Sequence, residues 1–184
     1  MSDRASQIIL LCEDRAQEGL TRAFLKECGM KSLKYALKAR VVGGFSFVLD
    51  QFAKELKACR IQRKAKTNTL LIVLIDADLL SVEKRRDELL KRATSAGLEK
   101  FGDDEPAVLL IPKRNIETWL KSLHDQNVNE EDDYKGRKKP SKEDFRLAAK
   151  TLREWCISPP KPDSTCVPSL RKALPDWIKV SRQT

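Results

Sequence analysis

The chain has 184 residues, a formal net charge of +9, five Cys and a single His, so chemistry that needs several His side chains is excluded. Its length favours one compact domain, and a hydrophobic content of 41% is enough for a core, which excludes global disorder. The longest apolar run, TLLIVLIDADLL, is interrupted by two Asp before it reaches the ~20 residues of a membrane-spanning helix, so we expect a cytoplasmic protein that does not enter the membrane.

Four short aliphatic runs have the composition of buried strands, and they occupy residues 8–12, 41–42, 70–75 and 107–111. Each is followed by apolar residues at helical spacing, over about residues 16–28, 47–59, 81–96 and 116–123. Gly residues separate several of these segments, and Ser81 is a suitable N-cap. Strand and helix alternating four times predict an α/β fold with a mostly parallel four-stranded sheet flanked by helices.

The character of the chain changes at Gln126. The segment NVNEEDDYKGRKKPSKED is nearly free of apolar residues and reads as an exposed loop. Ser141 then caps a helix that carries apolar residues from 145 to 155, and the proline-rich remainder has one short helical pattern around 170–174. We therefore expect an α/β domain at 1–125 and, at 126–184, a loop and helical extension that packs on it.

Polar residues follow three of the four predicted strands. Glu13 follows the first, Asp76 and Asp78 follow the third, and Lys113 and Glu117 follow the fourth. Because the loops after parallel strands converge at one edge of the sheet, these side chains are expected to lie close together. Carboxylates at short range repel one another unless a cation neutralises them, and an all-oxygen ligand set suits Mg²⁺ or Mn²⁺.

Ordinary structural roles compete with this interpretation. Glu13, Asp14 and Glu18 also suit the first turn of the helix that follows, and Lys113 also suits a solvated surface. The pair Asp76 and Asp78 is harder to explain by packing, because two charges at the mouth of a buried strand rarely help a core. The sequence therefore predicts a metal site that centres on this pair.

The order of four motifs resembles the TOPRIM domain, and specifically the branch found in OLD-family nucleases and in small standalone TOPRIM-like proteins of bacterial and phage-defence loci. The motifs are IILLCEDRAQEGLTRAFL, VVGGFSFVLDQFAKEL, LLIVLIDADLL and VLLIPKRNIETWL. The likeness covers about residues 7–124. It implies a TOPRIM-like, Rossmann-like sheet, and the Gly that the family has after the second strand matches Gly43 or Gly44.

The resemblance also implies the residues of the site. The acidic residue after the first strand and the D-x-D after the third bind divalent metal in that family, which places the metal ligands at Glu13, Asp76 and Asp78. The I-E-x-W element places Glu117 as a ligand or an orienting residue. This chain has Asp14 where the family usually has Gly, which leaves open whether Glu13 or Glu18 is the first acidic residue of the site.

The implied activity is that of a Mg²⁺- or Mn²⁺-dependent nuclease, because 184 residues leave no room for the additional domains of a topoisomerase or a primase. Lys113 would neutralise charge that develops on the phosphate. The net charge of +9 agrees with a nucleic-acid substrate, either DNA or RNA. By analogy with OLD systems, and because this chain has no Walker A motif, we expect a separate ABC-type ATPase subunit and a role in antiviral defence. Self-association into a homo-oligomer stays open.

Two other classes of protein fit the same residues. A phosphoacceptor domain of the response-regulator type also has acidic residues after its first strand, an Asp after its third and a Lys late in the chain. A non-catalytic interaction subunit could keep the acidic cluster without activity. An adduct on Asp76 after treatment with acetyl phosphate would favour the first, and the absence of both metal binding and cleavage would favour the second.

Overall fold

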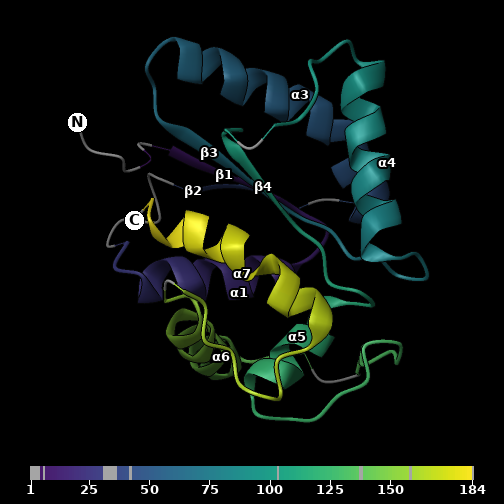
Figure 1. Cartoon of the computed structure of the whole chain (residues 1–184), viewed down its shortest axis with the longest axis vertical. Helices are drawn as coiled ribbons and strands as arrows, with labels where there is room; N and C mark the ends of the chain where they lie inside the picture. Colours follow the sequence, from purple (N-terminus) through teal and green to yellow (C-terminus); the bar gives the residue numbers. More distant parts are fainter. Residues whose placement is uncertain are drawn as a thin grey trace.

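The computed structural model describes residues 5, 7–30, 37–41, 43–102, 104–136, 139–157 and 159–183. The strands β1 (Gln7–Cys12), β2 (Leu37–Val41), β3 (Thr69–Leu74) and β4 (Ala107–Leu110) pair in parallel in the order β2-β1-β3-β4. Helices cover both faces of this sheet (Figure 1). The predicted α/β class with a parallel sheet is therefore confirmed.

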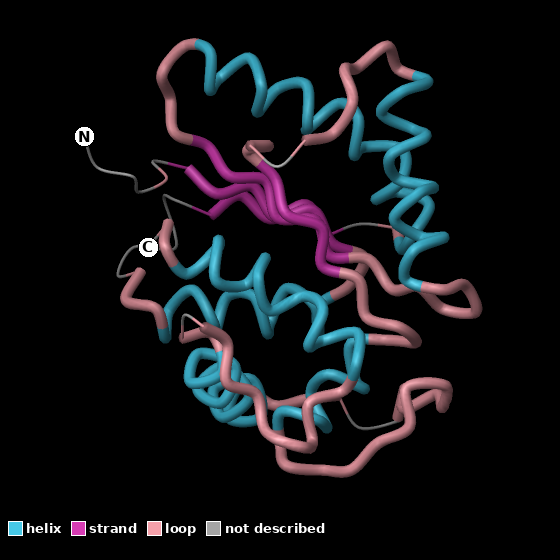
Figure 2. The backbone as a smooth tube through the Cα atoms, viewed as in Figure 1, coloured by secondary structure: helices cyan, strands magenta, loops and turns pink. Residues whose placement is uncertain are grey.

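Alternating side chains of the central strands pack into two separate layers. Figure 2 shows helices on both sides of the sheet. One layer is formed with the helices α3 (Gly44–Lys64) and α4 (Val82–Ser95), and its core includes Leu71 and Val73. The other is formed with the helices α1 (Arg15–Glu27), α5 (Ile116–Leu123), α6 (Lys142–Trp155) and α7 (Pro168–Ser181), and its core includes Leu70 and Ile72. Because β1 and β3 are covered on both faces, the residues between their first and last positions are all aliphatic.

Side-chain caps fix the start of the helices that follow the strands. Asp14 caps α1 by accepting hydrogen bonds from the backbone N–H groups of Ala16 and Gln17, and Ser81 and Asn115 cap α4 and α5 in the same way. α3 instead begins after Gly43, whose φ of 84° is the left-handed conformation that glycine adopts without strain. These caps place the N-termini of α1, α4 and α5 at the carboxyl edge of the sheet.

Two elements differ from the sequence prediction. The second strand covers Leu37–Val41 rather than 41–42, and Val42 lies outside the described residues. α7 runs through Pro175 to Ser181, whereas the apolar pattern predicted a helix only around 170–174. A proline inside a helix costs ~3 kcal/mol, but the residues after it bury Trp177 and Val180 fully, and each large buried side chain contributes about 2 kcal/mol. Tertiary packing therefore carries the helix past the proline.

α7 also occupies hydrogen-bonding groups of the outer strand β4. The carboxylate of Asp176 accepts the backbone N–H of Leu109, and burial raises the pKa of that carboxyl group. Nζ of Lys179 donates to the backbone oxygen of Glu105, just before β4, at 2.6 Å. α7 thus packs on the sheet and covers part of its edge.

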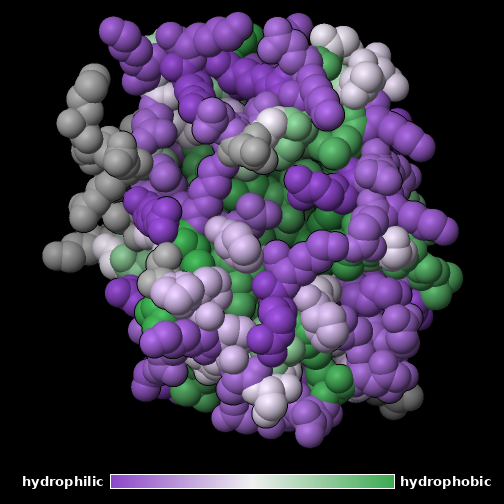
Figure 3. Space-filling view, viewed as in Figure 1, coloured by the Kyte–Doolittle hydropathy of each residue, from purple (hydrophilic) through white to green (hydrophobic). Residues whose placement is uncertain are grey.

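The face that shows β4 in Figure 1 is largely hydrophilic, with apolar residues gathered in its middle between α4 and α7 (Figure 3). Among the described helices, none combines the length and the apolar character that a membrane crossing needs.

Candidate functional site

The ends of β1 and β3 bring Glu13 and Asp76 into direct contact. The two strands are neighbours in the sheet, with Cys12 paired to Leu74, so the residues that follow them emerge side by side. Oε1 of Glu13 accepts a hydrogen bond from the backbone N–H of Asp76 at 2.5 Å. The geometric expectation that acidic residues from separate loops meet at the carboxyl edge therefore holds for this pair.

Asp76 lies at the centre of the cluster and is 0% exposed. Its Oδ1 accepts a hydrogen bond from Nε2 of Gln17 at 2.9 Å, and Oε1 of the same amide accepts the backbone N–H of Glu13 at 2.8 Å. Within the described residues its Oδ2 has no hydrogen-bond partner, and it forms an ion pair with Nζ of Lys135 at 3.6 Å. One oxygen of a fully buried carboxylate is therefore left to a weak ion pair, which is a costly arrangement.

Burial and crowding raise the pKa values of these acids. Burial raises the pKa of Glu13 to about 7, and the nearby charge of Asp78 adds to the effect although the Asp76 N–H opposes it. Burial, followed by the charge of Glu13, raises the pKa of Asp76 well above its usual range. Both shifts mean that burial, together with the neighbouring acids, disfavours the ionised form of these two carboxyl groups.

Asp78 lies at the mouth of the cluster, with a side chain that is 41% exposed. Its φ of 55° is left-handed, a conformation that Asp adopts more readily than most residues. The buried guanidinium of Arg85 holds this turn, because its Nε donates to the backbone oxygen of Asp76 at 3.0 Å and its Nη2 lies 3.5 Å from Oδ2 of Asp78. Arg85 thus fixes the turn after β3 from the buried side, while the carboxylate of Asp78 stays partly exposed to solvent.

Glu117 and Lys135 border the same cluster. Burial raises the pKa of Glu117, and the charge of Asp14 adds to this. Its Oε2 is buried and has no hydrogen-bond partner among the described residues. Burial lowers the pKa of Lys135, but the surrounding carboxylates, Asp76 and Asp78 first among them, raise it overall. Lys135 therefore supplies a cation to a group of acids that come from three strand ends.

Lys113 and Glu18 make other contacts. Nζ of Lys113 donates to Glu131 at 2.9 Å, and within the described residues this side chain does not contact Glu13 or Asp76. Glu18 is bound by the guanidinium groups of Arg15 and Arg22, each at 2.7 Å, which lower its pKa against the effect of burial. Of the two candidates for the first acidic residue, Glu13 is the one that reaches the cluster.

The donor set fits a divalent cation in kind. Asp76 and Glu117 each present a buried oxygen that accepts no hydrogen bond from the described residues, and Glu13 and Asp78 add further carboxylates. Among the described residues, however, no three His, Cys, Asp or Glu side chains are already gathered as a ligand set. Lys135 and Gln17 instead hold the central carboxylate in this arrangement.

Sequence reasoning missed Gln17, Arg85 and Lys135. Gln17 lies one helical turn after Glu13, and that spacing was available as a signal that both face the same edge. Arg85 lies in the first turn of α4, which begins four residues after Asp78, so the sequence order placed it close to that turn. Lys135 had no such signal, because it lies in a long, highly charged loop whose path depends on tertiary contacts such as the 2.8 Å hydrogen bond from Asn115 to Asp133.

Comparison of the chain with models of known protein families, with curated protein sequences and with solved structures gives no match. The TOPRIM resemblance rests on the motifs of this chain alone.

Proposed function

We propose that the protein is a metal-dependent nuclease that cleaves phosphodiester bonds in nucleic acid. The observation that carries the proposal is the buried carboxylate of Asp76, which lies against Glu13 and has an oxygen that accepts no hydrogen bond from any described residue. A structural ion pair would be expected to satisfy both partners, whereas this group is undersupplied with positive charge. Strongly shifted carboxyl groups in such a position are typical of functional sites.

Glu13, Asp76 and Asp78 are the proposed metal ligands, and Mg²⁺ or Mn²⁺ suits their oxygen donors. When bound, such an ion supplies Lewis-acid activation of a phosphate oxygen and lowers the pKa of a water molecule. Gln17 keeps Oδ1 of Asp76 fixed, and Arg85 fixes the turn that carries Asp78. These two residues orient the carboxylates before any ligand arrives.

Lys113 and Glu117 complete the proposed catalytic set. Lys113 lies after β4 at the same edge of the sheet, and its ammonium would stabilise negative charge on the phosphate once released from the exposed Glu131. Glu117 would serve as an additional ligand or would orient one, because its buried Oε2 has no partner in the described part of the chain. Both assignments follow the TOPRIM-like order of motifs.

The proposed partners follow from charge and from the resemblance. A net charge of +9 supports a polyanionic substrate, DNA or RNA. As in the OLD systems that the motifs resemble, the proposal includes a separate ABC-type ATPase subunit and a role as the effector of a phage-defence system.

Incubation of the wild type and of Asp76→Asn with supercoiled DNA, single-stranded DNA and tRNA, in Mg²⁺ or Mn²⁺, tests the activity. Asn keeps the oxygen that accepts from Gln17, so the fold is retained while the charge is removed. We expect cleavage by the wild type alone, and Asp87→Asn, an exposed carboxylate on α4, is the matched control. Equal cleavage by wild type and Asp76→Asn would remove the site assignment.

A phosphoacceptor function is the second candidate. The observation that favours it is that Asp76 follows the third strand, contacts Glu13 and has a lysine at 3.6 Å. A stoichiometric adduct on Asp76 after treatment with acetyl phosphate or beryllofluoride and Mg²⁺, without cleavage of any nucleic acid, would favour this reading. The absence of cleavage, of an adduct and of any Mn²⁺-dependent change in Tm would favour a non-catalytic interaction subunit.

A further inference from the structure

Two adjoining hollows lie at the amino edge of the sheet, at the opposite end from the acidic cluster. The larger, about 640 Å³, lies between the end of α3 and the loop 97–106. The smaller, about 380 Å³, continues past the start of β3 to the end of α7. Arg63, Asp104, Glu105 and Pro106 line both, so the two form one continuous depression, here called the amino-edge groove.

Basic residues outnumber acidic ones along this groove. The larger hollow is lined by five basic residues, namely Lys57, Arg60, Arg63, Lys64 and Lys100. The smaller adds Lys179 and Arg182. The acidic residues of the lining are Glu99, Asp104 and Glu105. The groove therefore presents an excess of positive charge along its whole length.

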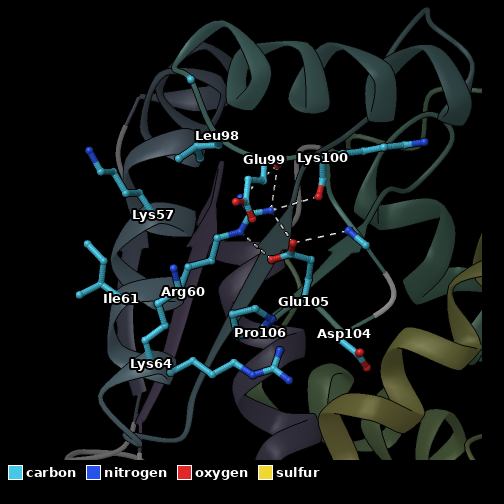
Figure 4. A pocket seen from close by; sticks show the side chains of 13 residues that line it. Lys57, Arg60, Ile61, Lys64, Leu98, Glu99, Lys100, Asp104, Glu105 and Pro106 are labelled. Carbon is cyan, nitrogen blue, oxygen red and sulfur yellow. Dashed lines mark hydrogen bonds and ion pairs between the residues drawn. The ribbon is translucent and has the colours of Figure 1, made fainter.

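The side chain of Arg60 bridges the two sides of the larger hollow. Figure 4 shows its side chain reaching from α3 to Glu105 and to the backbone of Glu99 and Lys100 on the facing loop. Its Nε lies 3.0 Å from Oε2 of Glu105, and its Nη1 lies 3.0 Å from the backbone oxygen of Glu99. Because Arg60 pairs with Glu105, the excess of positive charge in the groove comes from the other basic residues of the lining.

The other cations of the larger hollow are available to a ligand. Lys57, Arg63, Lys64 and Lys100 are all exposed, and within the described part of the chain none of these side chains forms an ion pair. Among the described residues that line the two hollows none is aromatic, so these residues offer no platform for stacking on bases. The chemistry that matches such a groove is a row of phosphates rather than a set of base edges.

We propose that the amino-edge groove binds the phosphate backbone of a nucleic acid without sequence preference and holds the polymer while the carboxyl edge acts on it. The choice of polyanion rests on the proposed function. The six-residue strand β3 separates the two edges by about 20 Å, a span of about six base pairs, so one polymer can reach both. Binding at the groove would then raise the local concentration of substrate at the acidic cluster.

The test is binding of a labelled duplex and a labelled single strand of about 30 nucleotides, followed by fluorescence anisotropy over a range of salt concentrations in EDTA. For the full chain carrying Arg63→Glu and Lys64→Glu we expect at least about tenfold weaker binding and a shallower dependence of log Kd on log salt. The control carries Lys142→Glu and Lys150→Glu, two exposed lysines on α6, and has the same net charge. We expect it to bind nearly as tightly as the wild type.

Equal loss of binding in the groove variant and in the α6 control would overturn the proposal, because net charge alone would then explain the affinity. Unchanged binding in the groove variant would also overturn it. A second variant, Lys57→Glu with Lys100→Glu, repeats the test if circular dichroism shows that the first has lost its fold.

The experiment separates this proposal from the proposed nuclease. In a cleavage assay the groove variant should show a raised KM with little change in kcat, whereas Asp76→Asn should lose kcat and keep its binding in EDTA. If the protein binds through the groove but cleaves nothing, the groove proposal stands and the nuclease proposal is rejected. If the protein cleaves nucleic acid and its groove variants bind as tightly as the wild type, the nuclease proposal stands and the groove proposal is rejected.

Discussion

The charged side chains at the two edges of the sheet are opposite in sign. They also differ in burial, and that difference is the more informative one. The N-termini of α1, α4 and α5 lie at the carboxyl edge, and the C-terminal turn of α3, with Arg63 and Lys64, lies at the amino edge. Helix dipoles alone favour acids at the first edge and bases at the second. The dipoles do not explain why Asp76 is fully buried, with an oxygen that accepts no hydrogen bond from the described residues, whereas Arg63 and Lys64 extend into solvent. Burial of charge, rather than its sign, distinguishes a candidate for chemistry from a candidate for binding.

The largest expected effect tests whether the buried acid does chemistry. Asp76→Asn should reduce cleavage by about a thousandfold or more, because it removes the central charge of the proposed ligand set. The same substitution should leave the Tm of the metal-free protein unchanged or raise it, since it removes a buried charge that is poorly compensated. Initial rates and thermal melting measure the two effects. A Tm that falls by many degrees would instead make Asp76 a structural residue.

The pH dependence of stability tests the same edge without substrate. The folded-state pKa of Glu13, about 7, lies above its ordinary value of 4.5, so its contribution to stability is fully present below pH 4.5 and is lost as the pH rises through about 7. Tm in EDTA should therefore fall across this window, and Glu13→Gln should flatten the fall. Added Mn²⁺ should raise Tm most at the upper end, where the ligands are ionised. A flat profile for the wild type would contradict the described environment of Glu13.

At the amino edge, Arg60 should matter for stability rather than for metal binding. Arg60→Ala leaves Glu105 without its partner and should cost about 2 kcal/mol of unfolding free energy. The double variant Arg60→Met with Glu105→Gln should recover part of the loss, because no unpaired charge is left behind. Urea denaturation measures both, and Mn²⁺ affinity should stay that of the wild type in each. A change in that affinity would show that the two edges are coupled.

The smallest expected effect concerns Lys135, the cation that competes for the acidic cluster. Lys135→Ala should tighten Mn²⁺ binding about tenfold, because the carboxylates lose a positive charge that lies 3.6 Å from Asp76. Isothermal titration of the variant against Lys139→Ala, an exposed lysine nearby in the chain, provides the comparison. Weaker Mn²⁺ binding in Lys135→Ala would show that this lysine supports the site instead of competing for it.

The fold and the acidic edge were predictable to different extents. Uninterrupted aliphatic runs located β1, β3 and β4, because a strand covered on both faces has few other sequences open to it, and Ser81 located the start of α4. β2 was placed too late and too short, because most of its residues carry no such run. The helix beyond Pro175 was missed because its stability comes from contacts such as that of Phe24 with Trp177, whose ring centroids are 4.7 Å apart.

Within the site, residues tied to strand ends were predictable and residues from distant loops were not. Glu13 and Asp76 meet because parallel pairing of β1 and β3 leaves their ends adjacent. Lys113 follows a strand as well, but within the described residues its side chain pairs with Glu131 in the loop after α5 and not with the acids of the cluster. Lys135 comes from the same loop, whose course is set by tertiary hydrogen bonds that sequence periodicity does not encode.

The cover that α7 places over β4 has a consequence for how copies of the chain behave towards one another. A bare outer strand offers its amide and carbonyl groups to any extended segment that passes, and this is how sheets grow from molecule to molecule into insoluble fibres. Asp176 takes up the Leu109 amide, and Lys179 takes up the carbonyl of Glu105 just before that strand. The last helix therefore occupies two of the backbone groups that pairing between copies at this edge of the sheet would use.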